Sequence, residues 1–242
     1  MASNLKIPIL EELVPGGFVY GQLLLVVYDP DSLWYETSLT IAAQGVRSGV
    51  RVEYHAYEHL PDKIRETFGS LGLNVKKLEE EDKLRILDSY TVQTGLGSTE
   101  RPSKSKIPVQ PLKLSDSSIE FAQLMKAGIP EMDKRWLHID DNTGIQLQYN
   151  DEKTVMTFTR TRIPSWVRAR ETTIVNSLVN GITSESFYKQ YLTLYDGIID
   201  FKNQEKEELE HLVRVRLMRG KSCDSRWHRL EILNNGEVAL VR

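Results

Sequence analysis

Cysteine is almost absent from this 242-residue sequence, in which Cys223 stands alone. A single cysteine cannot form an internal disulfide or a cysteine-rich metal site, which favours a reducing compartment. Long apolar runs are missing too, because the longest extends only from Leu23 to Tyr28, far short of the roughly 20 residues that cross a bilayer. The first residues also lack a basic segment followed by an apolar one. We therefore expect a cytoplasmic protein without membrane association.

The sequence also lacks a large excess of charge of either sign. It has 31 Lys and Arg against 34 Asp and Glu, which gives a formal net charge of -3, and 40% of its residues are hydrophobic. Disordered chains have a lower apolar fraction or a larger net charge, so an ordinary globular protein is indicated. A general attraction to nucleic acid is not predicted.

Short apolar segments alternate with amphipathic ones along the first two thirds of the chain. Leu23–Tyr28 has the pattern of a strand buried on both faces of a parallel sheet. A helix is predicted over 32–48, a strand over 50–56, and a second helix from Pro61, which suits a first helical turn. Further strands are predicted at 84–87, 136–139 and 172–178. This alternation predicts an α/β fold with helices on both faces of a mostly parallel sheet.

The remaining segments complete one predicted domain. A helix over 152–162 is ended or kinked by Pro164, and Ser184 is placed to cap another. Closing strands are predicted at 198–201, 212–218 and 226–233, and Asn235-Gly236 indicates a hairpin before 238–241. Glycine, serine and proline interrupt 91–116, which predicts a long flexible loop ahead of a helix over 117–128.

Seven local strings follow one another in a recognisable order. They are LVPGG at 13–17, AQGVRSG at 43–49, YEHLPDKI at 57–64, EEEDKLRILDSY at 79–90, WLHIDDNTG at 136–144, ITSESFYKQYLTLYDGII at 182–199 and RVRLMRG at 214–220. Together they resemble the KaiC family of RecA-superfamily P-loop ATPases over nearly the whole chain. The resemblance implies a three-layer RecA-like fold whose mostly parallel central sheet is extended by antiparallel C-terminal strands.

The resemblance fails at the phosphate-binding loop. The family motif GxxxxGK[ST] uses glycines to curl the backbone around phosphates, a lysine to neutralise them and a hydroxyl to bind Mg²⁺. None of the motif residues remains in its place among the eight corresponding residues here, which are Tyr28, Asp29, Pro30, Asp31, Ser32, Leu33, Trp34 and Tyr35. We expect Asp29 and Asp31 to face the phosphate space, where an opposite charge about 4 Å away would have contributed roughly 4 kcal/mol. The rings of Trp34 and Tyr35 are expected to fill the vacated space.

Other family positions are partly retained. The resemblance places Glu58 and His59 where the family has paired glutamates, and Asp140 where it has the Walker B aspartate. Leu217 replaces a lysine that reaches the neighbouring subunit's nucleotide, whereas Arg219 keeps the place of an arginine. These departures imply the fold without ATPase activity, and hence neither catalytic residues nor a cofactor.

A metal site is not predicted. Glu58 and Asp140 could hold a cation between two strand ends, but a metal needs more oxygen ligands than the sequence identifies. The histidines have no HxxxH or HxxE spacing, which argues against zinc; they are His55, His59, His138, His211 and His228.

The favoured function is a non-catalytic KaiC-like pseudo-ATPase that acts as a regulatory or scaffolding subunit. Family members stack their subunits, so the resemblance implies a homo-oligomer or a hetero-oligomer with a KaiC-like paralogue, with Arg219 at the contact. The alternative is a nucleic-acid-associated recombination or repair factor. It rests on the loop bearing Lys104 and Lys106 and on basic residues around Trp166, namely Arg160, Arg162, Arg168 and Arg170. An enzyme with a rebuilt pocket, using Glu58 or Asp140 as a base, stays open as a third possibility.

Overall fold

The computed structural model of the chain describes residues 4–56, 59–88, 133–141 and 151–241. Its elements, in chain order, are β1 (Asn4–Leu5), α1 (Pro8–Leu13), β2 (Phe18–Val19), β3 (Leu23–Tyr28), α2 (Trp34–Arg47), β4 (Arg51–Ala56), α3 (Pro61–Ser70), α4 (Val75–Glu80), β5 (Leu84–Asp88), β6 (Trp136–Asp141), α8 (Glu152–Thr161), α9 (Ile163–Arg170), β7 (Thr173–Val179), α10 (Glu185–Leu192), β8 (Gly197–Glu205), β9 (Leu209–Met218), β10 (His228–Ile232) and β11 (Val238–Leu240). The predicted loop at 91–116 and helix at 117–128 lie outside the described residues.

The central sheet has the strand order β11-β10-β9-β8-β3-β7-β6-β4-β5. The strands from β8 to β5 run parallel to one another. β3 lies in the middle and is apolar on both faces: Leu24 and Val26 belong to one core cluster, whereas Leu23, Leu25 and Val27 belong to the other. The continuous apolar run therefore marks a strand covered on both sides, as predicted.

Antiparallel strands from the C-terminal part of the chain extend one edge of the sheet. β9 pairs antiparallel with β8, and β10 and β11 form a hairpin in which Ile232 pairs with Val238. Gly236 in the hairpin loop has a φ of 83°, a conformation that favours glycine. These strands confirm the predicted antiparallel extension of a mostly parallel α/β sheet.

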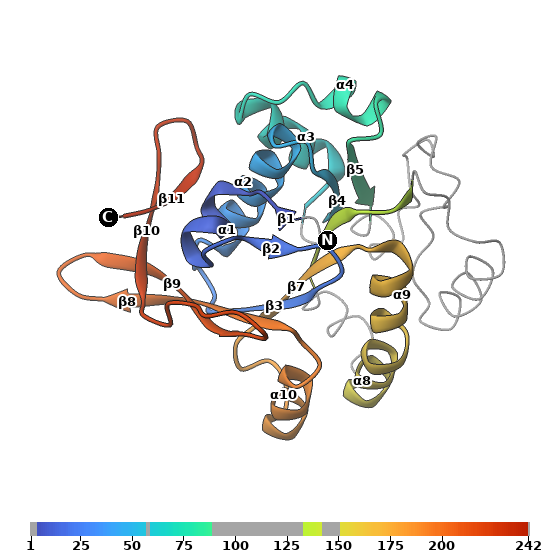
Figure 1. Cartoon of the computed structure of the whole chain (residues 1–242). Helices are drawn as coiled ribbons and strands as arrows, with labels where there is room; N and C mark the ends of the chain where they lie inside the picture. Colours follow the sequence, from blue (N-terminus) through green and yellow to red (C-terminus); the bar gives the residue numbers. More distant parts are fainter. Residues whose placement is uncertain (1–3, 57–58, 89–132, 142–150, 242) are drawn as a thin grey trace.

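Helices cover both faces of the sheet (Figure 1). α1, α2 and α3 lie on one face over the larger core cluster, and α8, α9 and α10 lie on the other. Ser184 caps α10, because its hydroxyl accepts a hydrogen bond from the Phe187 N–H at 3.2 Å. The three layers are those of a RecA-like fold.

Two local details differ from the sequence prediction. Pro164 does not simply stop a helix; α8 ends at Thr161 and a second helix, α9, begins at Ile163 with the proline in its first turn, where a missing N–H costs little. The short elements α1, α4, β1 and β2 were not predicted. None of the described helices is long and apolar enough to span a membrane.

Candidate functional site

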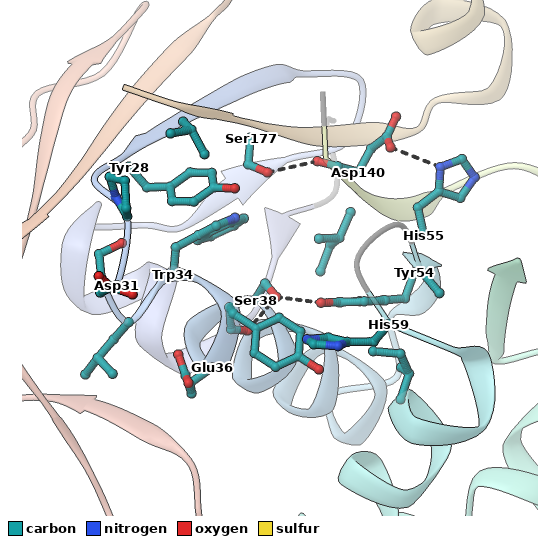
Figure 2. Close-up of a pocket in the computed structure, with 18 residues that line it drawn as sticks. Tyr28, Asp31, Trp34, Glu36, Ser38, Tyr54, His55, His59, Asp140 and Ser177 are labelled. Atoms are coloured by element: carbon teal, nitrogen blue, oxygen red, sulfur yellow. Dashed lines mark hydrogen bonds and ion pairs between the residues drawn. The ribbon is translucent and has the colours of Figure 1, made fainter. Parts of the chain in front are cut away.

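A pocket of about 540 Å³ opens at the carboxyl ends of the parallel strands (Figure 2). Its walls come from the ends of β3, β4, β6 and β7 and from the loop and first turn that lead into α2. In open α/β sheets, ligands bind in the crevice outside these strand ends. The pocket is therefore the candidate functional site.

The loop between β3 and α2 supplies one wall of the pocket. Residues predicted for the site do line it, namely Tyr28, Asp31, Ser32, Trp34 and Tyr35. Asp29 does not: its carboxylate accepts a hydrogen bond from Asn180 Nδ2 at 3.1 Å, beyond the end of β7. The expectation that both loop carboxylates face the phosphate space is therefore wrong for Asp29.

Aromatic rings flank the pocket. Trp34 is only 5% exposed, and its ring packs edge-on against Phe201 at a centroid distance of 5.3 Å and lies 6.5 Å from the ring of Tyr28. The ring of Tyr35 meets the imidazole of His59 at 4.7 Å. Trp34 thus belongs to the core as well as to the wall, and these rings leave the pocket open instead of filling it.

The charged groups around the pocket are mainly acidic. Among the described residues of its lining, Asp31, Glu36 and Asp140 are carboxylates, His55 and His59 are imidazoles, and none is lysine or arginine. Glu58, predicted for this site, lies outside the described residues. The described wall therefore offers no permanent positive charge to an anion.

A buried polar cluster lies where β4 and β6 run side by side. Glu53 is the register partner of His138, and residues two apart on a strand share a face. Glu53, His55, His138 and Asp140 therefore lie on one face of the strand pair. His55 Nδ1 lies 3.0 Å from one carboxylate oxygen of Asp140, and His138 Nε2 lies 3.7 Å from the other.

Two arginines hold Glu53 at the inner end of this cluster. Its carboxylate accepts hydrogen bonds from Arg85 at 3.0 Å and Arg170 at 2.9 Å, and it lies 3.1 Å from His138 Nδ1. Burial opposes ionisation of Glu53, but the charge of Arg170 and the hydrogen bond with His138 prevail and lower its pKa well below the ordinary value. The site is thus anchored by a buried, ionised carboxylate.

The pKa values of His138 and Asp140 are also set by burial on one side and by charged or hydrogen-bonded neighbours on the other. Burial lowers the pKa of His138, but hydrogen bonds with Asp140 and Glu53 outweigh burial and raise that pKa to about 9. Burial raises the pKa of Asp140, yet the charge of His55 and the hydrogen bond with His138 bring it below the ordinary value. The cluster is therefore an ionic network.

This cluster was not predicted from the sequence. Among the described residues, His55, His138 and Asp140 form the group of potential metal ligands that the fold brings together, although the histidines have no HxxxH or HxxE spacing. The available signal was the spacing: Glu53 and His55 are two apart on one predicted strand, and so are His138 and Asp140 on another. Recognising it required the pairing of β4 with β6.

Among the described residues behind the nucleic-acid alternative, one arginine is withdrawn from the surface. Arg170 is buried against Glu53, whereas Arg160, Arg162 and Arg168 are exposed. Trp166 packs against His138 at a ring distance of 5.9 Å. Lys104 and Lys106 lie outside the described residues.

Comparisons with known proteins agree with the topology. The chain is 26% identical to "UPF0273 protein MJ1359" of Methanocaldococcus jannaschii over 96% of this chain and 93% of that protein. Its fold matches the crystal structure of the KaiC-like protein PH0186 from Pyrococcus horikoshii OT3, with a TM-score of 0.70, 19% identity, and coverage of 100% of this chain and 99% of that one. The family described as "ATPase: KaiC" matches residues 4–240. The chain belongs to the KaiC family of the RecA superfamily.

Proposed function

We propose that this chain is a KaiC-family protein that has lost ATP hydrolysis and acts in the cytoplasm as a regulatory or scaffolding subunit. The observation that carries the proposal is the charge of the pocket wall. Its described lining contains Asp31, Glu36 and Asp140 but no lysine or arginine. A triphosphate placed beside the carboxylates of Asp31 and Glu36, where the described lining has no lysine or arginine to offset them, is repelled.

The backbone and side chains of the β3–α2 loop support the same conclusion. A helix N-terminus normally offers free N–H groups and a partial positive charge to phosphate. Here the first turn of α2 presents Trp34, Tyr35 and Glu36 to the pocket. Asp31 adopts a left-handed conformation with a φ of 63°, and it too lines the pocket. The loop therefore places bulk and negative charge where the family motif places glycine and lysine.

A scaffolding role requires a surface that contacts another subunit. The end of β9 supports one, because Leu217 is 38% exposed and Arg219 beside it is exposed as well. The guanidinium of Arg219 donates a hydrogen bond to the Thr193 carbonyl at 3.0 Å, which fixes its direction. We propose that this strand end contacts a second copy of the chain or a KaiC-like paralogue.

Thermal unfolding with and without millimolar Mg-ATP tests the loss of nucleotide binding. A ligand at 100 times its dissociation constant stabilises a protein by about 2.7 kcal/mol, which for this length raises the midpoint by roughly 5 to 10 °C. We expect no shift, because the pocket repels the phosphates. Phosphate release measured in parallel should stay at the background of the assay.

The informative control is Asp140→Asn, checked for folding by circular dichroism. A saturable rise in the unfolding midpoint of the unmodified chain would contradict the proposal. So would phosphate release by the unmodified chain that disappears in Asp140→Asn, because such release would belong to this pocket and not to a contaminant.

A further inference from the structure

The ends of β4 and β6 bring together three side chains whose clustering a scaffold does not require. We propose that His55, His138 and Asp140 bind a first-row divalent transition metal, of the class of Zn²⁺, beside the pocket. This inference shares Asp140 with the pocket wall on which the proposed function rests, and an ion bound there would offset part of the negative charge of that wall. It rests on the geometry of the cluster, on its buried support and on its position at the pocket wall.

The separations of the candidate ligand atoms suit a single ion. One nitrogen from each histidine and one carboxylate oxygen of Asp140 all lie within 4.8 Å of one another. His55 Nδ1 and His138 Nε2 lie 3.0 and 3.7 Å from the two oxygens of Asp140. In a tetrahedral zinc site with bonds of about 2.0–2.1 Å, the ligand atoms lie roughly 3.4 Å apart. The upper bound of 4.8 Å exceeds that separation by about 1.4 Å, a gap that small side-chain rotations can close.

Glu53 supplies the support that metal-binding histidines usually have. Such histidines commonly donate their second ring N–H to a carboxylate, which fixes the ring and the nitrogen that faces the metal. Glu53 Oε2 lies 3.1 Å from His138 Nδ1, so that ring nitrogen faces the carboxylate. That arrangement directs Nε2 toward Asp140. Arg85 and Arg170 hold Glu53 in place from the other side.

The ligand set selects the class of metal. Mg²⁺ and Ca²⁺ prefer oxygen ligands alone, whereas imidazole suits zinc, iron, copper and nickel. Two imidazoles and one carboxylate also leave a tetrahedral ion one ligand short, as in zinc sites that bind a water or a substrate. His55 and Asp140 both line the pocket. The fourth position therefore faces the pocket, where a water or a small ligand can reach the ion.

The test uses the full chain, stripped with a chelator and then titrated with Zn²⁺ in competition with a chromophoric chelator. We expect one zinc ion per chain. His138→Gln and His55→Gln should each weaken binding by at least about tenfold, because each removes a ligand nitrogen. Substitution with Co²⁺ should give a visible absorption spectrum that both variants change.

Matched controls separate this site from adventitious binding. His211→Gln removes a histidine that contacts Asn203 on the β8–β9 ribbon, and it should leave zinc affinity unchanged. Millimolar Mg²⁺ should not displace the zinc, and titration with Fe²⁺ identifies which transition metal binds more tightly. Because His138 is 2% exposed and His55 lies at the pocket wall, His55→Gln keeps the test decisive if His138→Gln fails to fold.

The proposal is overturned by any of three results. They are the absence of zinc binding at micromolar metal, binding that His55→Gln leaves intact, and a preference for Mg²⁺ over zinc.

Discussion

At the scale of single residues, the buried charges of the β4–β6 cluster are the most consequential feature. Glu53 is 3% exposed and Arg170 is 2% exposed, and Arg85 shares the same carboxylate. Taking such groups out of water costs several kcal/mol per ion, so each charge depends on its partners. The network therefore constrains both core stability and the position of His138.

Substitution Glu53→Gln should lower the free energy of unfolding by about 1.5–3 kcal/mol, because two buried guanidinium groups lose one charged acceptor and keep Asp133. Urea denaturation measures the change. Glu171→Gln is the matched control: its ion pair with Arg135 is exposed on both sides, and such pairs contribute about 1 kcal/mol or less. Equal effects of the two substitutions would contradict the buried role of Glu53.

The directions of individual side chains were the hardest feature to predict. Tyr28, Asp31 and Trp34 could be placed at the pocket because they correspond to the phosphate-binding motif of the family. Asp29 could not, since its direction depends on Asn180, which lies 151 positions away. The imidazoles of His55 and His138 come together through strand pairing, and no local spacing within one strand encodes it.

At the scale of elements, the sheet could be predicted largely from sequence. β3 is a continuous apolar run with clear ends, and α10 follows a serine that caps it. α1 and α4 have six residues each, too few for a helical period to stand out. α9, which holds Pro164 in its first turn, was not predicted, because proline suits a first turn as well as it ends a helix.

The close packing around Gly197, at the start of β8, can be tested by a substitution. A Cβ on Gly197 would lie 2.6 Å from Met218 Cε and 2.8 Å from Leu24 Cδ2, closer than packed atoms tolerate. Gly197→Ala should therefore destabilise the chain by about 1–3 kcal/mol through overpacking. Thermal unfolding monitored by circular dichroism gives the comparison with the unmodified chain.

Gly69 provides the opposite case within α3. A Cβ there meets nothing within 4 Å, and alanine favours a helix over glycine. Gly69→Ala should raise the free energy of unfolding by about 0.4–1 kcal/mol. A loss of stability in Gly69→Ala, or none in Gly197→Ala, would show that the packing around these two glycines differs from the structure.

At the scale of the whole molecule, the proposed subunit contact at the end of β9 predicts an effect in trans. In a mixed assembly with an active KaiC-like paralogue, Arg219→Ala should lower the partner's ATP turnover, because a cation facing the neighbouring nucleotide is lost. Arg226→Ala is the control, since its side chain is 85% exposed and pairs with the nearby Asp224. Unchanged turnover in Arg219→Ala would remove this contact from the proposal.

The strand order also determines when the sheet can assemble during synthesis. β3 is complete by residue 28, but its two neighbours, β7 and β8, begin at residues 173 and 197. Ribosomes add roughly 5–20 residues per second, so the middle strand waits on the order of ten seconds for its partners. Throughout that interval both of its edges and its five buried side chains lack their native cover. Chaperones or the chain's own N-terminal helices must therefore shield β3 until the last third of the protein has emerged.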